Sequence, residues 1–306
     1  MRRFFTSVWE VIAFPFRLLY NILAFPFRAV RRFIKFLNTD PEDTPLAEIF
    51  ANIATKTEMQ QGVLQNIEVM RKHLLRAVGV LTLFIIAAFW AAVPVMEFLA
   101  VPIGGLENLQ AIQVTEELGV FMRVAMMTGI AAAFPFLAFE AWLFIAPGLW
   151  SRDKKMGLIG IPISYLLFLA GMAFTFYVLL PAALPFLGGF TRIAEFWAAR
   201  EYFNFVTGLM LWIGLFFEMP LAVYFLTAIG LVEPKFLAEQ WRLAIVLIAV
   251  LAAAVTPTVD PVNMGLVMIP MIMLYFISIG MSYIARAGRR KAKAAAQDAL
   301  EETGAG

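Results

Sequence analysis

The chain contains no cysteine and only one histidine among its 306 residues. Without cysteine it can form neither a disulfide framework nor a thiolate metal site. The single histidine, His73, lies in the basic stretch RKHLLR, where we expect it to face solvent or lipid headgroups rather than a metal. Zinc motifs, phosphate-binding loops and dinucleotide fingerprints are missing too. We therefore expect no cofactor, no metal and no nucleic acid partner.

Charged residues are scarce as well. They make up 15% of the chain, while 62% of the residues are hydrophobic and the mean hydropathy is +0.82. Soluble domains contain roughly 45–50% apolar residues. A helix that crosses a bilayer needs about 20 mainly apolar residues. Several runs of this kind lie between Arg76 and Ala285, so the sequence indicates an all-α polytopic membrane protein.

Six runs are apolar enough to be membrane-spanning helices. The fifth holds only about 13 apolar residues, which gives a helix of roughly 20 Å at 1.5 Å per residue. Such a short span is either buried against its neighbours or placed where the membrane is thinned. The six predicted spans are residues 78–95, 120–143, 156–180, 203–226, 243–255 and 265–284.

Basic residues favour one side of the predicted bundle. With both termini on the same side, all of the 24 lysines and arginines lie there except Arg123, Arg192 and Arg200. By the positive-inside rule this side is cytoplasmic, which predicts a multi-pass protein of the cell membrane with both termini inside. Arg123 lies near the outer end of the second span, where a long side chain can reach the headgroups. The first outer loop is acidic, with Glu97, Glu107, Glu116 and Glu117.

The first forty residues form a separate segment. The string AFPFR occurs at 13–17 and again at 24–28, so equivalent side chains return to the same face of a helix after three turns. We predict that residues 1–38 are a basic amphipathic extension on an anionic membrane surface. The remaining predicted segments are a polar linker at 39–66 with a short helix starting near Thr44, a membrane domain at 67–285 and a basic, then polar, cytoplasmic tail at 286–306.

Glu218 lies in the middle of the apolar run LWIGLFFEMPLAVYFL. Asn204, Thr207 and Gly214 precede it at helical spacing, so this stripe should face protein rather than lipid. Exposing a charge to lipid at mid-membrane costs at least about 2.5–3.5 kcal/mol. Glu218 is therefore either a neutral carboxyl bonded to a neighbouring helix or part of a functional polar site. Pro220 adds a backbone carbonyl that needs a partner.

Two further polar segments border the spans. The stretch FEAWLFIAPGLWSRDKK, residues 139–155, reads as an ordinary basic cytoplasmic loop with aromatic interface anchors and a turn at Pro147. The stretch TPTVDPVN, residues 256–263, reads as an outer turn between two short spans.

These segments carry a family resemblance. EAWLFIAPGLWSRDKK, GMAFTFYVLLPAALPFL, FFEMPLAVYFLTAIGLVEPK and TPTVDPVNMGLVMIPMIMLY together resemble TatC, the six-helix receptor subunit of the twin-arginine (Sec-independent) protein translocase. The resemblance covers about residues 66–284. It implies a concave, glove-shaped bundle with short fifth and sixth helices and no enzymatic turnover. It also implies binding of twin-arginine signal peptides on folded cargo at the cytoplasmic face, with single-span TatA and TatB partners, oligomerisation within the translocase and export driven by the proton-motive force.

The resemblance also implies roles for individual residues. Asp153 matches the acidic residue of the first cytoplasmic loop that pairs with a signal-peptide arginine, and Phe144 and Pro147 match the residues that shape this loop. Glu218 matches the intramembrane glutamate linked to partner docking, and we expect it to meet a polar group on another chain's helix. Thr207 and Pro220 belong to the same polar site. Other matching positions are Arg123, Glu140, Trp142, Thr256, Pro257 and Asp260.

The chain departs from the family pattern at several positions. Aligning the first helix on Arg71 puts Val69 where the family has its second receptor glutamate, and Glu68 lies one residue early, about 100° round the helix. Asp153 is one methylene shorter than the usual glutamate. In the sixth span Phe276 replaces a glutamate, and Asn263 is the nearest substitute for a glutamine.

The sequence gives weaker support to two other functions. A proton-coupled small-solute transporter would use Glu218 and Arg123 as a relay, but transporters usually contain internal repeats and the six spans show none. A membrane-embedded enzyme has less support, because no nucleophile and base occur at suggestive spacing.

Overall fold

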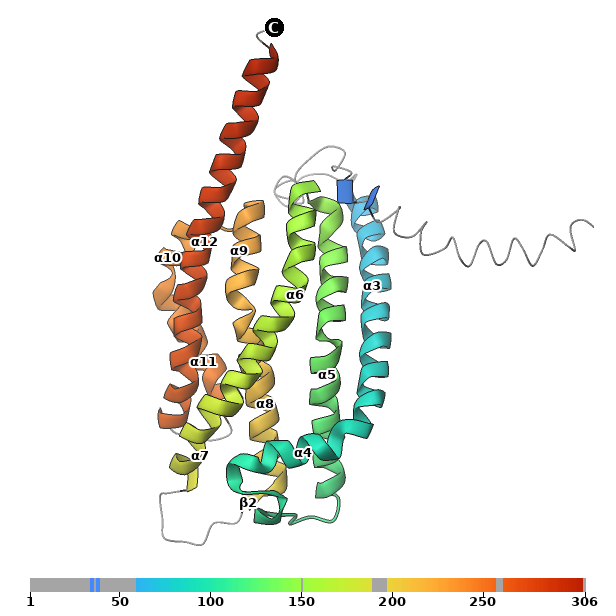
Figure 1. The fold of residues 1–306 in the computed structure, drawn as a ribbon, viewed down its shortest axis with the longest axis vertical. Helices are drawn as coiled ribbons and strands as arrows, with labels where there is room; N and C mark the ends of the chain where they lie inside the picture. Colours follow the sequence, from blue (N-terminus) through green and yellow to red (C-terminus); the bar gives the residue numbers. More distant parts are fainter. Residues whose placement is uncertain are drawn as a thin grey trace, which may run out of the picture.

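The structure is a computed structural model that describes residues 34–35, 37–38, 59–149, 151–188, 197–256 and 261–304. The repeated AFPFR strings and the predicted short helix near Thr44 lie outside these residues. Among the described segments, helices dominate, as the sequence predicts (Figure 1). The first long helix, α3, runs from Met59 to Ala88, so residues 59–66, predicted as linker, belong to it.

The first predicted span, residues 78–95, is not one continuous helix, so the prediction of where it ends is wrong. Helix α3 stops at Ala88, a short turn covers Phe89–Ala91, and α4 (Ala92–Ala100) continues at an angle of 73°. Pro94 supplies the physical reason. Its ring would clash with the carbonyl of Trp90 in a continuous helix, whereas in the first turn of α4 its missing N–H costs nothing. In Figure 1, α4 lies across the end of the bundle.

Two short strands close this end of the bundle. The chain passes through 3₁₀ turns at Val101–Ile103 and Leu106–Asn108 into β1 (Leu109–Gln110). Strand β1 pairs in parallel with β2 (Trp197–Ala198), which precedes α8. The segment before α5 is therefore tied to the start of α8 by a small cap of backbone hydrogen bonds.

Three long helical segments form the centre of the bundle. The first is α5, and a 3₁₀ turn, η4, joins it to α6. A π-helical turn, η5, connects α6 to α7 without a break in direction, whereas Glu218 interrupts the third segment between α8 and α9. The bounds are Glu116–Ile145 for α5, Ala146–Gly148 for η4, Ser151–Phe174 for α6, Thr175–Leu179 for η5, Leu180–Gly188 for α7, Ala199–Phe217 for α8 and Met219–Ile229 for α9.

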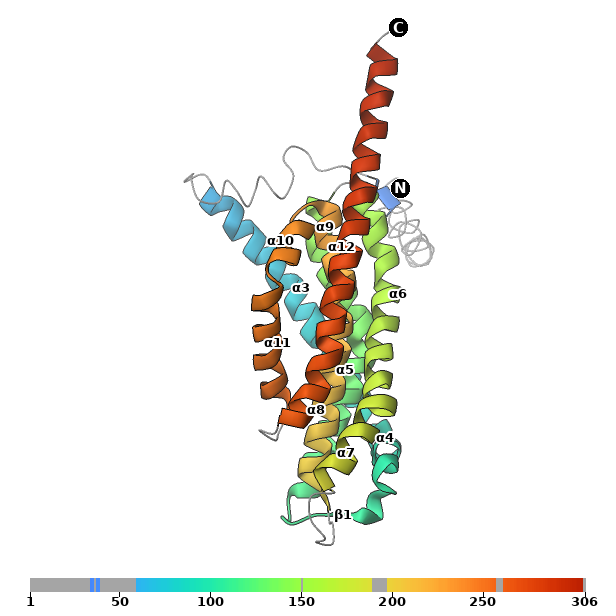
Figure 2. The same cartoon turned by 90° about the vertical axis from the view of Figure 1, so that its left-hand side faces the viewer.

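The last part of the chain adds α10 (Pro234–Glu239), α11 (Trp241–Val255) and α12 (Pro261–Gly304). Helix α11 is as short as the sequence predicts, and it lies beside α12 in both side views (Figures 1 and 2). Helix α12 continues beyond the bundle, so the predicted polar tail is helical up to Gly304.

Four helical segments are long and apolar enough to cross a membrane. They are residues 116–145, 151–186, 199–229 and 261–290. The bent pair formed by α3 and α4 passes the same test when its two parts are taken together, and α11 is a shorter apolar helix. The polytopic character is thus confirmed, and full crossing by α3 and α11 stays a prediction.

The core lies where α6 and α8 approach each other most closely. A Cβ atom on Gly171 would come within 2.8 Å of the Gly214 Cα, so the two backbones are almost in contact. The ring of Phe168 stacks on Phe134 of α5 at 4.1 Å between centroids. Small residues at the crossing let the helices pack by close van der Waals contact, which is how helices associate in lipid.

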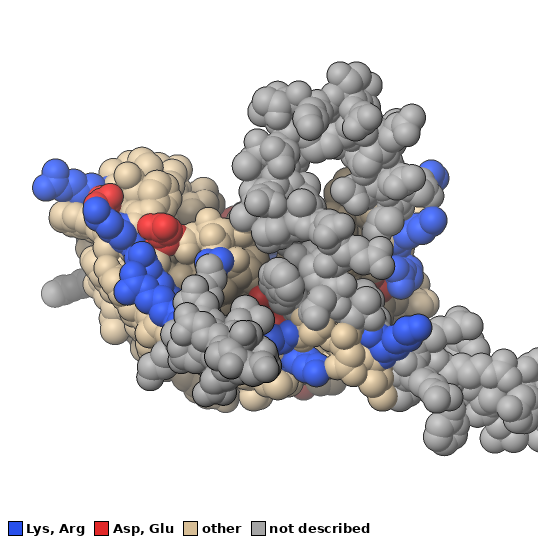
Figure 3. Space-filling model, turned by 90° about the horizontal axis from the view of Figure 1, so that it is seen from above, with Lys and Arg blue, Asp and Glu red and all other residues tan. Residues whose placement is uncertain are grey.

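Basic side chains gather at one end of the molecule, which we call the basic end (Figure 3). Here α5 ends, α6 begins and α12 leaves the bundle. The strand pair and the acidic loop lie at the other end, which we call the capped end. Exposed basic residues at the basic end are Arg71, Lys72, Arg76, Arg152, Lys155, Lys235, Arg289 and Arg290.

Candidate functional site

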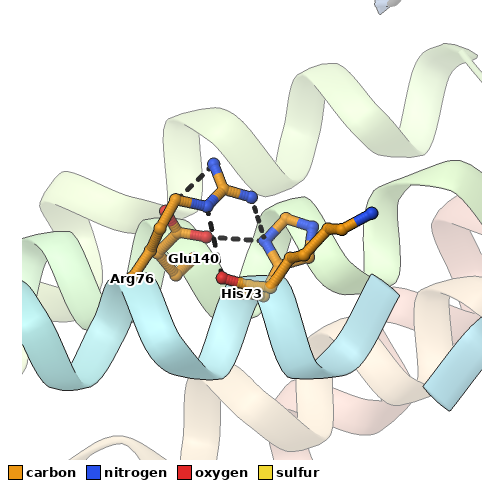
Figure 4. A network of polar contacts seen from close by, with 4 residues as sticks. His73, Arg76 and Glu140 are labelled. Atoms are coloured by element: carbon orange, nitrogen blue, oxygen red, sulfur yellow. Dashed lines mark hydrogen bonds and ion pairs between the residues drawn. The ribbon is translucent and has the colours of Figure 1, made fainter. Parts of the chain in front are cut away.

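A buried carboxylate joins α3 to α5 at the basic end (Figure 4). Glu140 on α5 is only 4% exposed. Its Oε2 lies 2.6 Å from Nδ1 of His73, and its Oε1 lies 3.5 Å from Nη1 of Arg76, both on α3. A buried charge needs such partners, because burial without them costs several kcal/mol. The prediction that His73 faces solvent or headgroups is wrong, since its side chain is 16% exposed and bonded to Glu140.

The same histidine contacts the aromatic residue that the family resemblance singles out. The rings of His73 and Phe144 lie 6.4 Å apart at 67°, an edge-to-face arrangement. Phe144 follows Glu140 by one helical turn, so both side chains project from one face of α5. Phe144 is 43% exposed, and Pro147 in the adjoining turn η4 is exposed as well. The basic end therefore presents an aromatic and proline surface with His73 beneath it.

Asp153 follows this surface in the chain but does not lie in a loop. Helix α6 begins at Ser151, which puts Asp153 in its first turn, and the predicted loop is reduced to η4 and two further residues. An acidic side chain is favoured there by the helix dipole, which explains the early start of the helix. Asp153 is half-buried and directly follows the exposed Arg152.

Trp142 fixes the hairpin between α5 and α6. It is buried, it stacks on Phe139 at 5.8 Å, and it lies directly against Gly157 of α6. A Cβ atom on Gly157 would come within 2.3 Å of the indole Nε1, so a glycine is needed at this position. The tryptophan thereby sets the spacing between Phe144 on one side of the turn and Asp153 on the other.

Of the two predicted binding residues on the first helix, the structure describes the side chain of only one. Glu68 and Arg71 both belong to α3. The Arg71 side chain is exposed at the basic end, whereas the Glu68 side chain lies outside the described part of the chain. A role for Glu68 as the second receptor carboxylate thus stays a prediction.

Glu218 is bonded within its own chain. It stands at the break between α8 and α9, and the hydroxyl of Ser164 on α6 donates a 2.6 Å hydrogen bond to its Oε2. This bond agrees with the alternative of a carboxyl bonded to a neighbouring helix, and the expected contact with another chain's helix stays a prediction. Its Oε1 is buried and accepts no hydrogen bond from the described residues. Pro220 is buried in the first turn of α9, where a proline is tolerated.

Arg123 turns toward the protein instead of toward the membrane surface. Its Nε donates to the Thr207 hydroxyl at 2.9 Å and its Nη2 donates to the Asn204 carbonyl at 3.3 Å, both on α8. Thr207 and Glu218 are eleven residues apart on this helix, about 16 Å at 1.5 Å per residue. That separation is too long for direct proton transfer, so the arrangement gives no support to a relay between Arg123 and Glu218.

The geometry can be compared with known proteins. Residues 65–270 match the family model described as Sec-independent protein translocase protein (TatC). The chain belongs to the TatC family. TatCy of Bacillus subtilis (strain 168) is 35% identical over 243 residues, which cover 78% of this chain and 95% of the relative. TatC of Koribacter versatilis (strain Ellin345) is 35% identical over 64% of this chain and 72% of its own.

A solved structure agrees with the family assignment. The crystal structure of the twin arginine translocase receptor TatC superposes with a TM-score of 0.66 at 31% sequence identity. The match covers 72% of this chain and 99% of that one. The chain is therefore a multi-pass subunit of a Sec-independent protein translocase. The expectation of a short sixth helix is wrong, because α12 runs for 44 residues from Pro261 to Gly304, whereas the fifth helix, α11, is short.

At the capped end, a buried carboxylate has a structural role that the sequence did not predict. Glu116 is 3% exposed and accepts hydrogen bonds from three backbone N–H groups, those of Ile112, Gln113 and Arg200, at 2.9, 3.1 and 2.7 Å. It thereby holds the loop before α5 against the start of α8. A glutamate beginning an apolar helix is a recognisable capping signal, but its partner 84 residues away is not.

Of the three remaining predicted positions, the structure describes one. Thr256 is buried and its hydroxyl donates to the Ala252 carbonyl at 3.0 Å, which ends α11. Pro257 and Asp260 lie outside the described residues. Within the described ranges, no three histidine or carboxylate side chains cluster in a way that could hold a metal ion.

Proposed function

We propose that the chain binds the twin-arginine signal peptides of folded cargo at its basic end. The observation that carries the proposal is the arrangement around η4: exposed Phe144 and Pro147 on one side, and half-buried Asp153 at the start of α6 on the other. Guanidinium groups form charge-assisted, forked hydrogen bonds with carboxylates. The apolar part of a signal peptide would lie on the aromatic surface while an arginine reaches Asp153.

The proposal places the basic end at the cytoplasmic face of the cell membrane. Its support is the concentration of exposed lysine and arginine side chains there, as the positive-inside rule requires. Both termini would then be cytoplasmic, with the N-terminal extension on anionic lipid. Glu68 on α3 is the candidate partner for the second arginine.

The proposal also gives Glu218 a role in assembly. Its Oε2 is held by Ser164, while its Oε1 is buried without a hydrogen bond among the described residues, so a polar group on a TatA-type or TatB-type helix could use it once the side chain turns outward. Interhelical hydrogen bonds in lipid contribute about 0.6–2 kcal/mol, enough to favour one docking position over others. The chain would thus nucleate an oligomeric translocase that exports folded proteins on the proton-motive force, without catalytic turnover of its own.

Peptide binding to the reconstituted protein tests the receptor role. A fluorescent twin-arginine peptide should bind at least about tenfold more tightly than its twin-lysine counterpart, because lysine lacks the forked geometry. Asp153→Asn should remove most of this preference, whereas Glu239→Gln, which changes an exposed carboxylate at the same end, should not. Equal affinity of the wild-type protein for both peptides would overturn the proposal.

A further inference from the structure

Helix α4 has no polar face. Glu97 is the only polar side chain among its nine residues. One face packs on the bundle, where the ring of Phe98 stacks on Phe176 of η5 at 4.4 Å between centroids. The buried residues of α4 are Ala92, Leu99 and Ala100. A helix without a polar face is normally buried in protein or surrounded by lipid, so the other side of α4 needs a cover that is not water.

The side of α4 that faces away from the bundle is exposed. Trp90, in the turn before the helix, is 89% exposed, and Val93 and Val101 are exposed as well. Together with exposed Glu97, these residues follow one another at spacings of three and four, so they form one stripe, which we call the α4 stripe. Three of its four side chains are apolar, which is the opposite of what a water-facing helix surface carries.

Helix α3 is too short to cross the hydrocarbon core by itself. Its exposed basic side chains, Arg71, Lys72 and Arg76, mark the level of the headgroups at the basic end. The guanidinium of Arg76 lies 3.2 Å from the ring of His73, so this level reaches as far as His73. From His73 to Phe89, just past the end of α3, the helix rises by about 24 Å, whereas the hydrocarbon core is about 30 Å thick. Figure 2 shows that α3 also runs obliquely, so it covers less depth still, and α4 begins inside the core.

The far end of α4 lies near the opposite edge of the hydrocarbon core. Phe98 contacts Phe176, which follows the exposed Lys155 by about 32 Å along α6 and η5. That distance matches the thickness of the core. Glu97, next to Phe98, is exposed, and residues 77–106 contain no other charged side chain. The carboxylate of Glu97 can thus reach the headgroups at the capped end, while the beginning of α4 lies deeper.

We propose that α4 crosses the leaflet at the capped end obliquely and that the α4 stripe contacts the acyl chains of this leaflet, with Glu97 at the headgroups. Helices α3 and α4 then complete a single crossing as a broken span, and together they are long and apolar enough for one. The proposal depends neither on signal-peptide binding nor on which end of the bundle is cytoplasmic.

Lipid fits the α4 stripe better than a second copy of the chain does. The exposed apolar surface continues onto α3, where Leu83 and Ile86 precede Trp90 at helical spacing. Helices that associate in lipid meet through small residues, and the α4 stripe contains none. A specific contact between two proteins buries about 800 Å² on each partner, for which four side chains are too few.

Spin labels test the proposal, because a chain without cysteine accepts single-cysteine variants without background labelling. Trp90→Cys and Val93→Cys are labelled in the full-length protein, reconstituted in phosphatidylcholine vesicles, and probed with oxygen, which concentrates in hydrocarbon, and with a water-soluble nickel chelate. Leu83→Cys on α3 is the lipid control, and Glu107→Cys in the turn before β1 is the water control. Both α4 labels should show the ratio of oxygen to nickel accessibility of the lipid control, several times that of the water control.

Two other results would overturn the proposal. Nickel accessibility at positions 90 and 93 equal to that of the water control would show that α4 lies in water. Labels shielded from both probes, with spin–spin broadening that disappears on dilution with unlabelled protein, would show that a second copy covers the α4 stripe. A label at Glu97→Cys should give an intermediate ratio, and a ratio as high as that of the lipid control would contradict its place at the headgroups.

Lysine substitutions give a check without a label. Val93→Lys places an ammonium group in the hydrocarbon core, whereas Glu97→Lys exchanges one charge at the headgroups for another. The amount of folded protein in membranes should fall several-fold for Val93→Lys and stay close to that of the wild type for Glu97→Lys. Equal amounts of the two variants would contradict a start of α4 inside the hydrocarbon core.

Discussion

The hydroxyl of Ser164 donates a 2.6 Å hydrogen bond to Oε2 of Glu218, and this contact joins the middle of α6 to the break between α8 and α9. It satisfies one oxygen of a carboxyl that lies deep in an apolar bundle and leaves the other without a hydrogen bond among the described residues. The same side chain is thus anchored in its own subunit through Oε2, while its buried Oε1 would become accessible to another subunit only after the side chain moves.

Replacing Ser164 with alanine should destabilise the bundle. The variant removes a hydrogen bond between two helices in apolar surroundings, which costs about 0.6–2 kcal/mol. Ser278→Ala is the matched control, because Ser278 is also buried but bonds to the Leu274 carbonyl of its own helix. Unfolding in detergent should show a larger loss for Ser164→Ala, and equal losses would mean that the bond to Glu218 carries no stability.

Substitutions of Glu218 should separate folding from assembly. Glutamine can still accept from Ser164, so Glu218→Gln should fold normally but co-purify less TatA-type partner. Lysine cannot accept from the hydroxyl and brings a cation into the bundle, so Glu218→Lys should impair both. Yield, thermal unfolding and partner co-purification measure these effects. If all three proteins gave the same yield and the same complex, Glu218 would be incidental.

The crossing of α6 and α8 should tolerate no side chain at Gly171. A Cβ there would lie 2.8 Å from the Gly214 Cα, and a backbone atom cannot relieve the clash by a change of rotamer. Gly171→Ala should therefore cost about 1–3 kcal/mol. Gly79→Ala on α3, whose Cβ would have nothing within 4 Å, should be neutral or slightly stabilising. Thermal unfolding of the two variants in parallel gives the comparison, and a neutral Gly171→Ala would contradict the close crossing.

The carboxylate of Glu116 should hold the capped end together. Glu116→Ala leaves three backbone N–H groups without their acceptor and should cost about 1.5–3 kcal/mol, with faster proteolysis of the loop before α5. Glu117→Ala changes an exposed neighbour and should stay within about 0.5 kcal/mol of wild type. Equal protease resistance of both variants would exclude this role for Glu116.

Much of the fold could be predicted from local patterns. The stripe of small and polar residues that ends at Glu218 correctly predicted that this side chain faces protein, because the periodicity of a helix indicates which face is buried. The break after Ala88 also has a local cause, Pro94, but the apolar run continues past it and conceals the end of the helix. Hydrophobicity alone cannot tell a straight span from a bent one.

Contacts between distant segments could not be predicted. Ser164 lies 54 residues from Glu218, and a serine in an apolar helix carries no sign of its partner. His73 lies 67 residues from Glu140, and its basic neighbours indicated solvent exposure. Both pairs can be identified only from the packed structure, because each bond depends on which faces of two helices meet and not on the sequence of either helix alone.

A signal-peptide arginine should bind beside η4 at the basic end. Photo-crosslinking tests it most directly, with a photoreactive amino acid at Ile145, which is exposed next to Phe144, and a second one at Val114, fully exposed at the capped end. A twin-arginine peptide should crosslink from position 145 and not from position 114, and Asp153→Ala should strongly reduce the product. Equal crosslinking by a twin-lysine peptide, or an unchanged yield in Asp153→Ala, would contradict the account.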